Sequence, residues 1–155
     1  MKLYRLAKDR PGKYRADDLS GNGAAIAGGR WNPPGMRALY TCVSPSTAVL
    51  ELRVHASGII PAGNLFLIEV SVPDELIARG YQPELPQDWA ALAAPASTVE
   101  IGRAWLAEGR SLAMKVPSVV CPADWNVILN PLHGDFRSLK VTRQEAFVLD
   151  ARLFR

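Results

Sequence analysis

The sequence predicts an α+β domain in which a few helices flank a mixed or antiparallel β-sheet. Short stretches of apolar and β-prone residues recur along the whole chain, while clear helix start and stop signals frame only two segments. No internal repeat, low-complexity tract or linker divides the 155 residues, a length that fits one domain. Many short strands with two or three helices are typical of the α+β class, so we expect residues 1–155 to form a single domain of this kind.

Six stretches are predicted as strands: 2–6, 37–42, 65–72, 111–120, 126–131 and 144–150. The run at 65–72 is close to continuously apolar, which predicts a central strand buried on both faces. The stretch at 111–120 is interrupted by Pro117, and a proline cannot donate to the ladder, so this strand is expected at an edge or a bulge.

Two helices have clear boundaries, and a third short one is expected near Trp89. Ser44-Pro45 predicts the first helix start, because the serine can accept from the first backbone N–H groups and the proline needs no donor there. This helix is expected to end at Gly58. Ser97 and Glu100 have the spacing of a capping box and predict a second helix, which is expected to end at Gly109.

Composition and charge exclude several classes of protein. Lys plus Arg number 18 and Asp plus Glu 15, and the basic residues are scattered, so generic DNA binding is not indicated. A pocket that collects an anion remains open. Cys42, Cys121, His55 and His133 show no metal-ligand spacing, so no metal is expected. No secretory signal and no apolar run of about 20 residues is present, which favours a cytoplasmic protein with both thiols free.

The segment GGRWNPPG at 28–35 has two interpretations. Gly28 and Gly29 allow a close backbone approach, Arg30 offers a planar fork of donors for a phosphate, and Trp31 offers a stacking face. These features suit a nucleotide pyrophosphate. The alternative is a tight turn with a surface arginine and a core tryptophan, and the residues alone leave both open.

Other polar side chains carry the same ambiguity. Glu51 lies inside an apolar helical run and faces either solvent or a cleft, where burial would raise its pKa unless a cation compensates. Glu69, within the strongest strand, should reach an edge or a partner. Tyr40 suits core packing, Ser118 follows the strand break at Pro117, and Asn130 precedes a proline in a turn-like context.

Taken in order, these motifs resemble those of the RES domain, the toxin half of bacterial RES–Xre toxin–antitoxin systems. The resemblance covers nearly the whole chain, from Tyr4 to about Phe154. The family takes its name from an arginine, a glutamate and a serine. The residues that match them here are Arg30 in GGRWN, Glu51 in AVLEL and Ser118 in VPS. Further matches are Arg5 in the first strand, Tyr40 in LYT, Asn130 in NPLH, and a final strand at 150–154.

The resemblance implies a fold similar to diphtheria-toxin-type ADP-ribosyltransferases and NAD as substrate. It implies cleavage of the nicotinamide–ribose bond by hydrolysis or phosphorolysis, or transfer of ADP-ribose to a protein. It also implies an Xre-type helix-turn-helix antitoxin that blocks the active site, with DNA contacted only through that antitoxin and a homodimer allowed within the complex. A non-catalytic module that only docks a partner remains the alternative.

The resemblance also assigns roles. Glu51 is expected to stabilise the oxocarbenium-like ribose, Tyr40 to face the nicotinamide, and Ser118 to hold the ribose or the nicotinamide amide. The expected catalytic residues are Arg30, Tyr40, Glu51 and Ser118. The expected NAD-binding residues are Arg5, Arg30, Trp31, Tyr40, Ser118 and Asn130.

Overall fold

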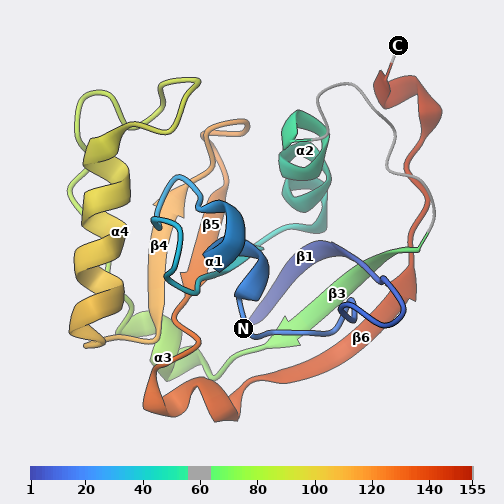
Figure 1. Ribbon diagram of the computed structural model, residues 1–155, viewed down its shortest axis with the longest axis horizontal. Coiled ribbons are helices and arrows are strands. Elements are labelled where there is room, and N and C mark those ends of the chain that lie inside the picture. Colours follow the sequence, from blue (N-terminus) through green and yellow to red (C-terminus); the bar gives the residue numbers. More distant parts are fainter. Residues whose placement is uncertain (56–63, 155) are drawn as a thin grey trace.

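The computed structural model of the protein describes residues 1–55 and 64–154 and shows one curved sheet flanked by helices (Figure 1). The strands are β1 (Lys2–Lys8), β2 (Leu39–Cys42), β3 (Leu65–Ser71), β4 (Ala113–Pro117), β5 (Trp125–Leu129) and β6 (Lys140–Ala146). The helices are α1 (Asn22–Ala27), α2 (Pro45–His55), α3 (Asp74–Ala78) and α4 (Ala96–Glu108), with 3-10 turns η1 (Gly134–Ser138) and η2 (Ala151–Phe154). None of the described helices is long and apolar enough to cross a bilayer.

The six strands form one sheet in the order β4-β5-β2-β1-β3-β6, and each neighbouring pair is antiparallel. The α+β prediction is therefore confirmed, with the antiparallel form of the sheet. The strand that contains Pro117 lies at one edge, as its proline predicts. The apolar run at 65–71 forms β3, which has a hydrogen-bonded neighbour on each side.

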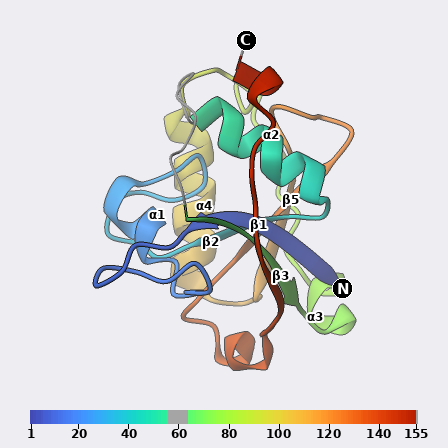
Figure 2. The ribbon, with the colours of Figure 1, turned by 90° about the vertical axis from the view of Figure 1, so that its right-hand side faces the viewer.

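Side chains alternate between two faces of the sheet, and each face has its own core cluster. On the first face, Leu39 and Leu129 pack with residues of α3, η1 and the 9–21 loop. On the second face, Tyr40 and Ile128 pack with Trp105 of α4 and with the 31–38 segment. Figure 1 shows α4 along the β4 edge, and the quarter turn of Figure 2 shows α2 lying over β1.

The start of α2 agrees with its sequence signals. The helix begins at Pro45, and Ser44 Oγ accepts from the backbone N–H of Ser46 at 3.2 Å. Its expected end at Gly58 lies outside the described residues. Near its C-terminal end, Arg53 Nε donates to the carbonyl of Leu153, and its guanidinium lies 4.6 Å from the ring centroid of Phe154. Helix α2 is thereby joined to η2 at the C-terminus.

The predicted capping box of α4 is wrong, although the helix itself forms. The residue before the helix is Pro95, and no side chain caps its N-terminus. Ser97 Oγ instead donates to Asp88, and Glu100 accepts from Arg103. Residues 87–90 form a turn, so the short helix predicted near Trp89 is wrong. Gly109 ends α4 in the left-handed conformation, as expected.

The last predicted strand is also misplaced. The strand β6 spans Lys140–Ala146, whereas the sequence predicts a strand at 144–150. The expected final strand at 150–154 is also wrong, because Ala151–Phe154 forms the 3-10 turn η2. All residues of β6 are exposed, and polar side chains lie on both of its faces. The strand therefore lacks the alternation of apolar and polar residues from which a strand is predicted.

Candidate active site

The carboxylate of Glu51 is the centre of a hydrogen-bond network on the second face. Ser118 Oγ donates to Glu51 Oε1 at 2.9 Å, and Asn126 Nδ2 donates to the same oxygen at 2.6 Å. Both donors are neutral. Among the described residues, nothing donates to the other oxygen, Oε2, and no cation pairs with this carboxylate. The carboxylate is therefore held by one oxygen, and its other oxygen has no hydrogen-bond partner within the described part of the chain.

The position of Ser118 follows from the break in the edge strand. After Pro117 the chain turns, and the Ser118 N–H donates to the carbonyl of Asp124 at 2.9 Å. The Ser118 hydroxyl accepts from the Cys121 N–H at 3.1 Å and gives its only proton to Glu51. Ser118 is 0% exposed. In this arrangement the Ser118 hydroxyl holds Glu51, and its expected contact with a ribose or an amide stays a prediction.

Asn126 is a site residue that the sequence analysis did not select. A carboxylate only accepts hydrogen bonds, so the Asn126 amide must turn its NH₂ toward Glu51. Its Oδ1 is then buried and has no hydrogen-bond partner within the described part of the chain. An unpaired buried acceptor costs about 1–3 kcal/mol, so this oxygen is a candidate to accept a hydrogen bond from a ligand. An asparagine at the start of an apolar strand was the only sequence signal.

Cys42 shows how close the negative charges lie. It is paired with Asn126 in the β2–β5 register, so its side chain lies on the same face. Burial, followed by the negative charges of Glu51 and Asp124, raises the pKa of the Cys42 thiol to about 12. The thiol is therefore protonated at neutral pH and is unsuited to act as a nucleophile.

Arg30 is held by main-chain carbonyls and not by an acidic side chain. Its Nη1 donates to the Trp89 carbonyl and its Nη2 to the Ala91 carbonyl, each at 2.8 Å. Burial raises the pKa of the Tyr40 hydroxyl, and the nearby Arg30 charge opposes that rise. The positive charge of Arg30 therefore stands beside Tyr40, without a carboxylate to neutralise it within the described residues.

The Tyr40 hydroxyl holds the GGRWN segment in place through two hydrogen bonds. The Tyr40 hydroxyl donates to Asn32 Oδ1 at 2.8 Å and accepts from the Trp31 N–H at 3.0 Å. A Cβ on Gly29 would lie 2.6 Å from that hydroxyl oxygen, so the approach requires glycine. Trp31 itself is 3% exposed and packs in the core, which leaves its ring unavailable for the stacking expected from the sequence.

The two groups share one face of the sheet. Tyr40 and Cys42 are two residues apart on β2, so their side chains point the same way, about 7 Å apart along the strand. Arg30 lies beside the first and Glu51 beside the second. The structure thus brings Arg30, Tyr40, Glu51 and Ser118 to the same side of the sheet.

Arg5 is not brought to this group. On β1 it alternates with Tyr4, which is paired with Cys42, so its side chain points to the first face. Its Nη1 donates to the carbonyl of Asp18 at 2.8 Å. Burial lowers the pKa of the Arg5 guanidinium, and the negative charge of Asp18 opposes this shift.

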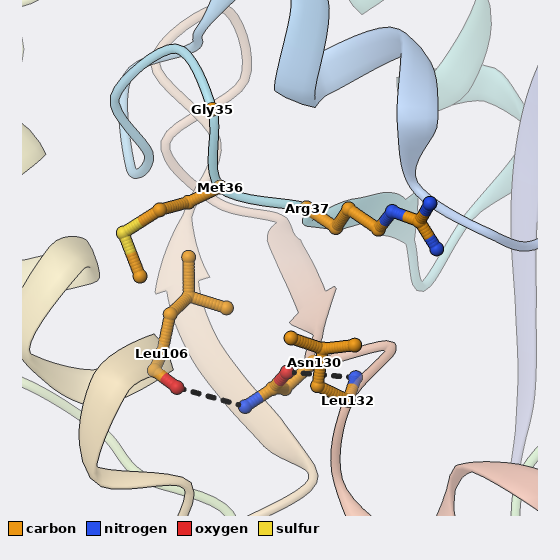
Figure 3. A pocket seen from close by; sticks show the side chains of 6 residues that line it. All are labelled: Gly35, Met36, Arg37, Leu106, Asn130 and Leu132. Atoms are coloured by element: carbon orange, nitrogen blue, oxygen red, sulfur yellow. Dashed lines mark hydrogen bonds between the residues drawn. The ribbon is translucent and has the colours of Figure 1, made fainter.

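Asn130 lies at the opposite end of β5 from Asn126, roughly 13 Å along the strand at about 3.3 Å per residue. Its Nδ2 donates to Leu106 O at 3.3 Å, and its Oδ1 accepts from the Leu132 N–H at 3.0 Å. Figure 3 shows these contacts beside a cavity of about 180 Å³, also lined by Met36. The amide of Asn130 is thus used to join α4 to the chain after β5.

Within the described residues Glu69, unlike Glu51, is paired with a cation. Its Oε1 accepts from Thr142 Oγ1 at 2.8 Å and lies 3.0 Å from Lys2 Nζ. These contacts, Thr142 first and Lys2 second, lower the pKa of the Glu69 carboxyl. Across the residues with described positions, no group of three His, Cys, Asp or Glu side chains could hold a metal ion.

Comparisons with known proteins give one consistent result. The RES domain family matches residues 2–150. A Sphingobium sp. (strain YBL2) protein named "Prs ADP-ribosylating toxin" is 38% identical over 157 residues, which cover 99% of this chain and 96% of that protein. A Yersinia enterocolitica protein named "Toxin Res" is 36% identical over 154 residues, with 99% of each covered. A chain in the crystal structure of the M. tuberculosis MbcT–MbcA toxin–antitoxin complex shares the fold at a TM-score of 0.68 and 18% identity, over 95% of this chain and 84% of that one.

Proposed function

The chain belongs to the RES domain family, and we propose that it is a toxin that cleaves the nicotinamide–ribose bond of NAD. The observation that carries the proposal is the state of Glu51. Its Oε1 is held by two neutral donors, and its Oε2 accepts nothing from the described residues. A carboxylate held in this way is suited to stabilise positive charge on a ligand.

The charges along β2 match the charges of NAD. The Arg30 guanidinium, beside Tyr40, supplies the positive end, and Glu51, beside Cys42, supplies the negative end. In NAD the diphosphate is negative and the nicotinamide–ribose end is positive. A dinucleotide lying along this face would place its diphosphate toward Arg30 and the scissile bond toward Glu51.

The proposed reaction requires the site to stabilise positive charge on the ribose and to accept one proton. As the C1′–N bond breaks, its electron pair leaves with nicotinamide, which becomes neutral, and the ribose develops oxocarbenium character. In this proposal Glu51 Oε2 stabilises that charge and then takes the proton that the attacking acceptor loses. Ser118 and Asn126 keep the carboxylate in place during this step.

The acceptor of ADP-ribose is proposed to be a protein side chain. Support comes from the Sphingobium relative, whose name states that it is ADP-ribosylating. Hydrolysis or phosphorolysis by the same site is the second candidate, because nothing among the described residues around Oε2 excludes a small acceptor. As the partner we propose an Xre-type antitoxin, consistent with the fold shared with a toxin–antitoxin complex.

The test is release of nicotinamide from NAD by the purified protein, measured by chromatography with and without cell extract. Glu51→Gln should lower the rate by about 10³-fold while thermal unfolding shows a folded protein. The matched control is Glu69→Gln, which removes a carboxylate already neutralised by Lys2 on the same sheet. Its rate should stay within about twofold of the unsubstituted protein, apart from any loss of stability.

Labelled NAD distinguishes the two acceptors. Label appearing on a protein of the extract supports transfer, whereas free ADP-ribose or its phosphorylated form supports hydrolysis or phosphorolysis. A folded protein that leaves NAD intact under all these conditions would overturn the proposal in favour of a partner-binding module.

A further inference from the structure

A hydrogen bond between Thr47 and Asp124 ties helix α2 to the turn that carries Ser118. Thr47 is 2% exposed, and its Oγ1 donates to Asp124 Oδ2. Thr47 lies four residues before Glu51, about one helical turn, so both side chains project from the same side of α2. The helix therefore meets the 118–126 segment through both Thr47 and Glu51.

Asp124 is itself fixed by the chain around it. Its Oδ1 accepts from the Trp125 N–H at 2.8 Å, and its own N–H donates to Cys121 O at 2.8 Å. Its carbonyl accepts from the Ser118 N–H at 2.9 Å. Together these hydrogen bonds form a closed ring through Thr47, Asp124, Ser118 and Glu51. The ring joins one turn of helix α2 to the loop that follows β4. A shift of the helix at Thr47 would be passed directly to Glu51.

This ring holds two carboxylates, those of Glu51 and Asp124, close to each other. Glu51 and Asp124 both lie close enough to Cys42 to raise the pKa of its thiol. Within the described residues both carboxylates are held by neutral donors. Two like charges held this way repel each other, so each needs a tether that fixes its position. Thr47 tethers Asp124, and Ser118 and Asn126 tether Glu51.

We propose that Thr47 and Asp124 are positioning residues for Glu51, an inference whose kinetic part rests on the proposed function. Neither side chain needs to touch the substrate. Their hydrogen bond fixes the register of α2 against the Ser118–Asp124 turn, and this register sets where Oε2 points. A displacement of about 1 Å at a reacting group can cost about 10²-fold in rate.

The kinetic test compares Thr47→Val, which keeps the shape but removes the hydroxyl, with Thr47→Ser, which keeps the hydroxyl. Thr47→Val should lower kcat for nicotinamide release by at least about 10-fold with KM within about twofold, and Thr47→Ser should restore most of kcat. The matched control is Thr98→Val, because Thr98 is also buried and donates to a carbonyl, that of Pro95 at 3.0 Å, in another helix. An equal kcat for Thr47→Val and Thr98→Val would overturn the inference.

A second measurement does not depend on activity. The side-chain NH₂ signals of Asn126, observed by NMR, report its bond to Glu51. They should move in Thr47→Val toward their position in Glu51→Gln, and they should stay in place in Thr98→Val. Unmoved signals contradict the inference even if kcat falls.

Two further outcomes remain decisive. If the unsubstituted protein releases no nicotinamide, the proposed function fails while the NMR comparison still decides the positioning role. If Thr47→Val does not fold, Asp124→Ala serves in its place. That variant removes the acceptor of the Thr47 hydroxyl, so the Asn126 signals should move and kcat should fall, with no such change if Asp124 is only structural.

Discussion

The Glu51 and Arg30 regions share one face of the sheet but are built on different principles. Glu51 is held by side-chain donors from β5 and from the turn that follows β4, in contacts that span 67 and 75 residues of sequence. Arg30 is held by two main-chain carbonyls of the 87–91 turn. The first arrangement fixes one atom of a reactive group, whereas the second fixes the path of a loop. We expect the Glu51 region to control kcat and the Arg30 region to control stability and substrate binding.

The largest effect should come from packing beneath the Arg30 region. Gly102 of α4 lies against the main chain of Trp31, and a Cβ there would be 1.7 Å from the Trp31 carbonyl oxygen. In an exposed helix, Gly→Ala would stabilise by roughly 1 kcal/mol. Here Gly102→Ala should destabilise by about 3 kcal/mol, because backbone atoms must move. Denaturant unfolding measures this.

Gly134→Ala is the control for Gly102→Ala, since a Cβ at Gly134 meets nothing within 4 Å. It should change the free energy of unfolding by less than about 0.5 kcal/mol. A Gly102→Ala protein as stable as Gly134→Ala would mean that the GGRWN segment is not pressed against α4, and the contrast between the two regions would lose its basis.

Ser118→Ala tests the Glu51 region. Removing one of two donors to Oε1 should lower kcat by about 10²-fold and leave KM within about twofold, because the hydroxyl gives its proton to Glu51. A substrate-binding role would raise KM instead. Ser138→Ala is the control, since that hydroxyl donates to the Asp135 carbonyl on the surface. Steady-state kinetics of nicotinamide release separates the two outcomes.

Arg30 should show the opposite kinetic pattern. Arg30→Ala should raise KM for NAD by about 10-fold with a smaller change in kcat, because it removes the positive charge proposed for the diphosphate. Arg30→Lys keeps the charge, so KM should rise by only about threefold. Lysine cannot reproduce the planar fork that donates to both carbonyls. Hydrogen exchange at 87–91 should increase equally in both variants. Equal KM values for the two variants would assign Arg30 to the loop alone.

The sequence predicts some parts of this molecule well and others poorly, for physical reasons. Interior strands such as β3 carry a continuous apolar signal, and the proline that marks an edge strand is a local property. Strand β6 is exposed along its length, so it carries no such signal. The ring through Thr47 and Asp124 depends on a contact between residues 77 apart. No local pattern encodes such a contact, and the direction of Glu51 depends on the same packing.

The smallest effect we predict is the contribution of the Glu51 charge to the raised pKa of the Cys42 thiol, which comes after that of burial. Because the pKa of the Cys42 thiol is raised to about 12 in the folded protein, the unfolded chain loses this proton first as pH rises. The contribution of Cys42 to stability is therefore complete below about pH 8.5 and falls above it, by about 1.4 kcal/mol per pH unit, until the folded thiol titrates. The measurement is the difference in unfolding free energy between the unsubstituted protein and Cys42→Ala from pH 8 to 10, which cancels the titration of lysines and tyrosines. In a Glu51→Gln background the fall should begin at the same pH, and the ultraviolet absorbance of the thiolate should show the folded thiol losing its proton at a lower pH, since one negative charge beside it is gone. A difference that stays flat with pH would show that neither burial nor Glu51 acts on this thiol, and the Glu51 carboxylate would then not lie over β2.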